Sequence, residues 1–261
     1  MKLLKNDNSF KYTIRSVELA FNLIEILAKG KMEYTISELM AKTQLPKGTV
    51  YRLLGTLNSL GYITHSKKKH TYYLTFKFSR IGIAMNERIH ILEIIPHMKK
   101  LAKEFREMVN LAILDQGQVV YLYSIESPHT LKLDFKVGTY QPAYCTALGR
   151  VLLAYQDENI LKLAIGEKRL TAYTSKTITD PYSLKEIFQK TREQGYSFVS
   201  EEYRTGICCL AGPIFDEKGD ITAAISFSLP TVRLEKDILQ DMIQAIKATT
   251  SKVKLPKLYK P

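Results

Sequence analysis

The spacing of apolar residues predicts three short helices at the start of the chain. In the first, five apolar residues recur at helical intervals: Val17, Ala20, Phe21, Ile24 and Leu27. Its end is expected near Gly30, because glycine commonly follows the last helical turn. Thr35 and Glu38 have the spacing of a capping box and predict the start of the second helix, which should end before Pro46.

The third helix, expected to begin at Pro46, has two unlike faces. Its apolar face holds Val50, Leu53, Leu54, Leu57 and Leu60. The opposite face holds Gly48, Tyr51, Arg52, Gly55 and Ser59, with Lys47 and Thr49 near the helix start. A helix packed on one side, with small, hydrogen-bonding and cationic residues on the other, suits the major groove of DNA.

Two short strands, 62–65 and 71–74, are predicted after the third helix. The turn between them is strongly cationic and consists of Ser66, Lys67, Lys68, Lys69 and His70. A solvated surface turn can have the same composition, so it is the order of the elements that carries the prediction. Three helices followed by a hairpin with a charged tip predict a winged helix-turn-helix.

The segment 76–107 has a helical pattern, and Pro96 is expected to end one helix and to let a second begin at a new angle. Its apolar stripe consists of Ile81, Met85, Ile89, Leu92 and Ile95. Such a stripe suits either the protein core or packing against a partner, and both interpretations stay open.

Beyond residue 108 the pattern becomes mixed and predicts an α+β domain built on an antiparallel sheet. Residues 109–115 and 119–126 flank Gly117 as a hairpin, and the alternation of apolar and charged residues from Leu131 to Lys136 predicts a half-buried strand. Further strands are expected at 198–200, 208–215 and 221–229, and helices at 147–155, 158–164, 183–194 and 235–252.

The charge is concentrated in the first third of the chain. The sequence has 38 basic and 26 acidic residues, a formal net charge of +12. Residues 1–90 hold 15 of the basic and 6 of the acidic residues, whereas residues 91–261 hold 23 and 20. A basic segment followed by a nearly balanced one indicates a polyanion-binding module joined to a part with another task.

Composition places the chain among globular proteins. A hydrophobic content of 45% with 25% charged residues excludes a disordered or collagen-like chain. No apolar run reaches the roughly 18 residues of a membrane span, and the first ten residues lack the pattern of a signal peptide. The three cysteines cannot form a disulfide framework and fit a reducing compartment. We therefore expect a cytoplasmic protein without membrane contact.

Five sequence motifs follow one another along the chain. They are the segments Pro46–Leu54, Leu60–Tyr62, Cys145–Ala154, Gly206–Asp216 and Ala223–Ser228. These motifs and their order resemble those of IclR-type bacterial transcriptional regulators, and the resemblance extends from about Ile14 to Leu234. The chain departs from the residues frequent in that family at Gly48, where serine is frequent, and at Arg150, where many relatives have lysine.

The resemblance implies an α+β protein with two domains. A winged helix-turn-helix DNA-binding domain would occupy residues 1–75, a linker helix residues 76–90, and a GAF-like α/β effector-binding domain with an antiparallel sheet residues 91–261. The resemblance further implies a homodimer, or a dimer of dimers, bound to double-stranded DNA at a palindromic operator. The implied activity is transcriptional regulation controlled by a small-molecule effector.

Three groups of residues are expected to contact DNA. The outward face of the third helix should reach base edges and adjacent phosphates, with Arg52 as the candidate for guanine. Its residues are Lys47, Gly48, Thr49, Tyr51 and Arg52. The hairpin turn should contact flanking phosphates or the minor groove through Lys67, Lys68, Lys69 and His70. Near helix starts, which favour anions, orientation should be fixed by Arg15, Ser16 and Thr35.

A candidate effector site lies in the second half of the chain. Strand alternation puts Ser226 and Ser228 on one face and the apolar Ile225, Phe227 and Leu229 on the other. The resemblance places Cys145, Thr146 and Ala147 at a helix start facing the serines, and Ile207 and Cys209 on the neighbouring strand. Backbone amides at a helix start together with hydroxyl groups favour a carboxylate, so a small organic acid is the expected effector. Serine hydroxyls satisfied by the backbone, and Cys209 as a small buried apolar residue, are the alternatives.

An enzyme is the main alternative to a regulator. Cys145 or Cys209 would be the nucleophile and His90, His97 or His129 the base, but no spacing joins them, so no catalytic residue is assigned.

Other chemistry finds little support in the sequence. Cys208 and Cys209 lack the spacing of a metal site, Glu201 and Glu202 are interpreted as surface residues, and no phosphate-binding loop appears, so no metal or cofactor is expected. A GAF-like sensor that acts through a protein partner remains a third interpretation.

Overall fold

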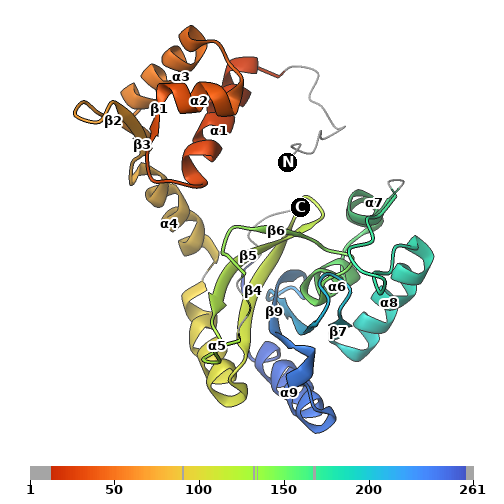
Figure 1. Cartoon of the computed structure of the whole chain (residues 1–261). Helices are drawn as coiled ribbons and strands as arrows, with labels where there is room; N and C mark the ends of the chain where they lie inside the picture. Colours follow the sequence, from red (N-terminus) through yellow and green to blue (C-terminus); the bar gives the residue numbers. More distant parts are fainter. Residues whose placement is uncertain (1–12, 90, 132, 134, 167–168, 257–261) are drawn as a thin grey trace. The chain divides into compact units, whose positions relative to one another are not determined.

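Two compact units make up the chain (Figure 1). The computed structural model describes residues 13–89, 91–131, 133, 135–166 and 169–256, with residues 84–89 described through their backbone alone. The first unit is Met1–Met85 and the second is Asn86–Pro261. The predicted domain boundaries at residues 75 and 90 stay predictions, because the helix between them contributes to both units.

The first unit has the elements of the predicted winged helix-turn-helix. They are α1 (Arg15–Ala28), β1 (Tyr34–Thr35), α2 (Ile36–Thr43), α3 (Lys47–Ser59), β2 (Ile63–Ser66), β3 (Thr71–Leu74) and α4 (Lys77–Ile89). β3 lies between β1 and β2 in an antiparallel sheet. The sequence pattern missed β1, because a strand of two residues is identified only by its pairing with β3.

Local sequence explains where these helices begin and end. The Thr35 hydroxyl accepts a hydrogen bond from the Glu38 amide and the Glu38 carboxylate accepts one from the Thr35 amide, which confirms the predicted capping box of α2. Pro46 directly precedes α3 as its N-cap. Gly61 follows α3 with a φ of 75°, in the left-handed region that glycine adopts at little cost.

α1 packs on the core through only part of the predicted face, with Leu27 in the core and Ile24 against it. Leu23 and Leu27 are buried, whereas the exposed fractions of Val17 and Phe21 are 49% and 60%. Helical spacing identifies residues that share a face, but α1 has two overlapping apolar faces and only its C-terminal half lies on the core. Leu60, predicted for the apolar face of α3, is also exposed, because it lies beyond the last helical turn.

The second unit is the predicted α+β domain with an antiparallel sheet. Its elements are α5 (Ile91–Phe105), β4 (Met108–Asp115), β5 (Gln118–Ile125), β6 (Tyr140–Pro142), α6 (Ala147–Ala154), α7 (Glu158–Ile165), α8 (Pro181–Gln194), β7 (Ser197–Ser200), β8 (Ile207–Phe215), β9 (Ile221–Pro230), the 3-10 turn η1 (Thr231–Arg233) and α9 (Lys236–Thr250). The strand order is β6-β5-β4-β9-β8-β7. Within the described ranges, no helix is both long and apolar enough to cross a membrane.

Helices cover both faces of this sheet (Figure 1). α5 and α9 pack on one face through residues such as Met98 and Ile246, whereas α6, α7 and α8 pack on the other. Successive side chains of β9 point alternately to these two layers, as predicted, so Phe227 faces α5 while Ser226 and Ser228 face the α6 side.

α6 lies unusually close to the preceding backbone. All eight of its residues are buried, and Thr146 caps it by accepting a hydrogen bond from the Gly149 amide. A Cβ atom on Gly149 would lie 2.1 Å from the Ala143 carbonyl oxygen. The segment that leads into α6 can therefore fold back against the helix only where residue 149 has no side chain.

Two predicted features of the second unit are wrong. α5 runs through Pro96, because the proline is its sixth residue and deprives only the carbonyl of Leu92, an exposed residue of the first turn, of a partner. The described residues between 126 and 139 form no strand, although Phe135 is buried. Alternation reports which side chains pack inward, and a segment that lies over the core without pairing gives the same pattern. Lys132 and Asp134 lie outside the described residues.

The predicted apolar stripe of 81–95 is not a continuous core face. Ile81 and Leu92 are exposed, and Ile94 and Met98 fill the core instead. The side chains of Met85 and Ile89 lie outside the described residues. The stripe begins in one unit and ends in the other, so a single helical period does not describe it.

Gly149→Ala tests the close packing of α6. We expect a loss of roughly 1–3 kcal/mol in the free energy of unfolding of the second unit, because the added methyl group overpacks the contact with Ala143. The thermal unfolding midpoint measures this. Gly82→Ala in α4 is the control: nothing lies within 4 Å of its Cβ position, so it should be neutral or stabilising. Equal midpoints for the two variants would contradict the prediction.

Candidate functional site

The outward face of α3 is exposed as predicted. Lys47, Gly48, Tyr51 and Arg52 are exposed, and Thr49 is half-buried at the first turn. Buried Val50, Leu54 and Leu57 hold the opposite face on the core. In the described part of the chain, neither Lys47 nor Arg52 forms an ion pair, so both cations are available to a partner.

The turn between β2 and β3 offers fewer free cations than the sequence suggests. Lys67 and Lys68 are exposed and have no carboxylate partner among the described residues. Lys69, however, pairs with Glu33 at 2.6 Å between Nζ and Oε1, and the Thr71 hydroxyl donates a second hydrogen bond to Glu33. These bonds lower the pKa of Glu33 and raise the pKa of Lys69. Lys69 therefore holds the base of the turn.

The start of α2 is also occupied by internal contacts. Glu38 binds both the amide and the hydroxyl of Thr35 and pairs with Lys31, and these bonds lower its pKa to about 2. A carboxylate thus already occupies the helix start that was predicted to meet a phosphate. Arg15 and Ser16 are exposed at the start of α1, where Arg15 pairs with Glu18 at 3.2 Å.

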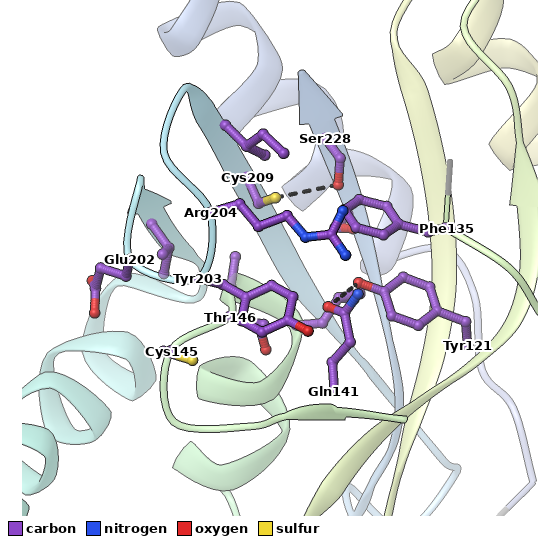
Figure 2. Close-up of a pocket in the computed structure, with 15 residues that line it drawn as sticks. Tyr121, Phe135, Gln141, Cys145, Thr146, Glu202, Tyr203, Arg204, Cys209 and Ser228 are labelled. Carbon is purple, nitrogen blue, oxygen red and sulfur yellow. Dashed lines mark hydrogen bonds between the residues drawn. The ribbon is translucent and has the colours of Figure 1, made fainter. Parts of the chain in front are cut away.

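All seven residues predicted for the effector site line one pocket (Figure 2). They are Cys145, Thr146, Ala147, Ile207, Cys209, Ser226 and Ser228. The pocket lies between the start of α6 and the sheet. The first amides of α6, which have no partner within the helix, point to this end.

The polar floor of the pocket, Cys209, Ser226 and Ser228, lies next to a hydrogen-bonded row of polar side chains in the sheet. Ser228 accepts a hydrogen bond from Asn110 Nδ2 at 3.1 Å and contacts the Cys209 sulfur at 3.3 Å. Asn110 in turn accepts one from the Ser124 hydroxyl at 2.7 Å. Ser226 differs from these residues: among the described residues, its buried hydroxyl has no hydrogen-bond partner. An unpaired buried hydroxyl costs free energy, which a bound ligand could recover.

Sequence reasoning missed several residues of the pocket wall. Tyr121 and Phe135 stack with their ring centroids 5.4 Å apart, and the Tyr121 hydroxyl donates to Gln141 at 2.9 Å. Tyr203 and Arg204 come from the connection between β7 and β8. Arg204 reaches across the pocket toward Phe135 and has no carboxylate partner within the described residues (Figure 2). Arg204 is exposed although it lines the pocket, and a charged, exposed residue in a connecting segment gives no sequence signal for a binding site.

Glu202 corrects the prediction that Glu201 and Glu202 are surface residues. Glu202 is buried, and its Oε2 accepts a hydrogen bond from Arg150 Nη2 at 2.6 Å and one from the Ile178 amide at 3.3 Å. Glu201 is half-buried, accepts a hydrogen bond from the Gly206 amide at 2.8 Å and pairs with Lys176. Adjacent acidic residues suggest solvent exposure, but here each carboxylate has a separate internal partner.

The cysteines lack the surroundings of a nucleophile. Burial raises the pKa values of Cys145 and Cys208 to about 12 and that of Cys209 to about 11. The described histidines are absent from the pocket: His97 lies on α5, across the sheet, and His129 follows β5. His90 lies outside the described residues. A thiol whose pKa is raised, and which has no neighbouring base, is a poor nucleophile.

Two family models match the chain over most of its length. The IclR helix-turn-helix domain matches residues 16–66, and the family described as bacterial transcriptional regulator IclR C-terminal matches residues 84–255. The chain belongs to the IclR family of bacterial transcriptional regulators. The exposed face of α3 lies within the first match and the whole pocket lies within the second.

Individual relatives agree with the family models. The HTH-type transcriptional regulator KdgR of Escherichia coli (strain K12) is 31% identical over 242 residues, which are 92% of this chain and 92% of KdgR. The transcriptional repressor IclR of the same strain is 30% identical and covers 91% of this chain, with 89% of its own length matched. A crystal structure of an IclR transcriptional regulator from Alicyclobacillus acidocaldarius is similar with a TM-score of 0.77 at 26% identity, over 92% of this chain and 98% of that chain.

Membership in the IclR family decides the general function. The chain is a DNA-binding transcriptional regulator with a C-terminal effector-binding domain, and it is not an enzyme. The predictions of a winged helix-turn-helix joined to an α/β effector-binding domain are confirmed. The individual contacts with DNA and effector stay predictions.

The burial of the three cysteines predicts selective labelling. Cys145 and Cys208 have no exposed surface, whereas Cys209 is partly exposed in the pocket wall. We expect the thiol reagent DTNB to modify Cys209 first in the native protein, at alkaline pH because its pKa is raised to about 11. Cys209→Ser should remove this first phase, which absorbance and peptide mass mapping would report. First modification at Cys145 or Cys208 would contradict the prediction.

Proposed function

We propose that a small organic acid, held in this pocket, controls the affinity of the chain for a palindromic operator. One observation carries the proposal: the buried Ser226 hydroxyl without a partner faces the same pocket as Arg204, which has no carboxylate partner among the described residues. A hydroxyl without a hydrogen-bond acceptor and an arginine without a carboxylate, both in one pocket, favour the binding of an anion that accepts hydrogen bonds.

A carboxylate fits the remaining groups of the pocket. The first amides of α6 carry the positive end of the helix dipole, and Thr146 and Ala147 hold that end over the serines. Arg204 would supply the opposite positive group, and Ser226 and Ser228 would bind the oxygens of the ligand. The stacked rings of Tyr121 and Phe135 would contact its carbon skeleton.

The DNA-binding half would work through three kinds of contact. Arg52 and Tyr51 would meet base edges in the major groove, with Lys47, Gly48 and Thr49 at the adjacent backbone. Lys67, Lys68 and His70 would contact flanking phosphates, and Lys69 would position their turn. Arg15 and Ser16 would meet phosphates near α1. Thr35 would act indirectly, by fixing the start of α2.

A twofold-symmetric dimer is the simplest assembly for this chain. Cyclic dimers are the commonest soluble oligomers, and a dimer of helix-turn-helix domains meets two half-sites about one helical turn apart. We therefore propose a homodimer or dimer of dimers on a palindromic operator, acting in the cytoplasm and controlling transcription there.

Substitutions in the first unit should separate specific from general DNA binding. Arg52→Ala should weaken the free energy of binding to a specific site, selected from a random DNA library, by roughly 1–3 kcal/mol. The affinity of the same variant for random DNA should change little. Lys68→Ala should weaken binding to both the selected and the random DNA. It should also reduce, by about one, the slope of the logarithm of the binding constant against the logarithm of the salt concentration. Fluorescence anisotropy at several salt concentrations measures both quantities. Arg52→Lys is the control, because it keeps the charge but loses the two-pronged geometry. Unchanged binding in Arg52→Ala and Lys68→Ala would overturn the assignment of both surfaces.

Ser226→Ala should separate ligand binding from folding. Without ligand it should keep or slightly raise the stability, because it removes a buried hydroxyl that has no partner in the described part of the chain. A small organic acid present at 100 times its Kd should stabilise the wild type by about 2.7 kcal/mol, and this gain should shrink in Ser226→Ala and in Arg204→Gln. Thermal unfolding against a panel of organic acids and matched neutral amides measures the gain. Stabilisation by the amides instead, or a full gain in both variants, would overturn the proposal.

A further inference from the structure

A buried ion pair, Arg150 and Glu202, lies next to the effector pocket, and the packing of the protein at this place does not require charged residues. The Arg150 and Glu202 side chains have exposed fractions of only 4% and 9%, and they pair at 2.6 Å. Removing two charges from water costs several kcal/mol per ion, and apolar residues can often replace such a pair without loss of stability. Packing alone therefore explains the pair poorly.

Glu202 holds two segments of the chain together through its side chain and its backbone. Its Oε2 accepts a hydrogen bond from the Ile178 amide, and its backbone carbonyl accepts one from the Thr177 hydroxyl at 2.6 Å. The segment that leads to α8 is thereby fastened to the connection that carries Tyr203 and Arg204 into the pocket. The carboxylate brings a negative charge into the wall of a pocket that we propose to bind an anion.

Arg150 neutralises the charge of Glu202 by pairing with it. Its Nη2 binds Glu202, and its Nε donates to the Tyr144 carbonyl at 3.0 Å, next to the start of α6. In Figure 2, Glu202 points away from the pocket, whereas Arg204, two residues along, reaches across it. With Glu202 paired, Arg204 is left as the charge that the pocket presents.

We propose that Arg150 is a positioning residue that sets the ligand selectivity of the effector pocket by cancelling the charge of Glu202. The inference rests on the proposed function, because it explains how the same pocket remains attractive to anions. Without Arg150, the Glu202 carboxylate would offset Arg204 through the low-dielectric wall, and the pocket would lose its preference for negative ligands.

The Cys209 thiol permits a test that needs no known effector. Cys209 lines the pocket and is the partly exposed cysteine of the chain. DTNB is an anion and N-ethylmaleimide is uncharged, and both react with the thiolate. The ratio of their rates at Cys209 therefore cancels changes in thiol ionisation and reports the potential inside the pocket. The full-length protein with Cys145→Ser and Cys208→Ser isolates this signal.

Three variants in this background give a pattern that a purely structural pair would not give. Arg150→Gln should lower the ratio of the DTNB rate to the maleimide rate by about threefold or more, because an uncompensated carboxylate repels the anionic reagent. Glu202→Gln should raise the ratio above the wild-type value, because it leaves the positive charge of Arg150 uncompensated. The double variant Arg150→Gln/Glu202→Gln should return it to the wild-type value. Since glutamine preserves much of the shape and hydrogen bonding of both residues, the rescue follows charge.

Two outcomes would overturn the inference. One is an unchanged ratio in Arg150→Gln. The other, which applies even if that single variant fails to fold, is an equal ratio in Glu202→Gln and in the double variant, because Arg150 would then have no electrostatic reach into the pocket. A failure of the proposed function would look different: no organic acid would stabilise the wild type, whatever the reagent ratios show.

Discussion

The close contact between α6 and the backbone at Ala143 is the constraint on which the second unit depends. Because Gly149 has no side chain, the segment that enters α6 folds back tightly, and Thr146 can both cap the helix and donate to the Pro142 carbonyl. That geometry holds the helix start opposite Ser226 and Ser228. The next residue, Arg150, is turned by the same helix into the interior toward Glu202. One small residue thus fixes the roof of the pocket and the direction of its buried cation.

Charge is used differently in the two units. In the first, the cations of α3 and of the turn between β2 and β3 stay exposed and, apart from Lys69, without carboxylate partners in the described part of the chain. Such cations attract a polyanion from solution. In the second unit, the strong charges near the pocket are paired, as for Arg150, or project from a connection, as for Arg204. A surface that recognises a long polyanion needs many charges, whereas a pocket that recognises a small one needs a single uncompensated charge.

The sequence predicted most elements because their signals are local. The capping box at Thr35, the two-faced α3 and the alternation of β9 each depend on neighbouring residues, and the structure contains all three. Resemblance to the IclR family supplied five of the seven predicted pocket residues, at the start of α6 and on β8, whereas strand alternation supplied Ser226 and Ser228 on β9. The errors arose where tertiary context decides. The packed face of α1, the path of α5 through Pro96 and the burial of Glu202 depend on partners that are distant in sequence. Arg204 was missed because only the fold turns its connection toward the pocket.

The contact between Lys69 and Glu33 bears on the entropy of binding. Glu33 directly precedes β1 and binds both Lys69 and Thr71, so it ties the end of the β2–β3 turn to the strand beside α2. A flexible hairpin would lose conformational freedom when its lysines settled on a backbone of phosphates. Here much of that freedom is already lost in the unbound unit, and Lys67 and Lys68 extend from a braced base. Lys69 is not free to bind a phosphate, but by bracing the turn it lowers the conformational entropy that Lys67 and Lys68 lose when they bind.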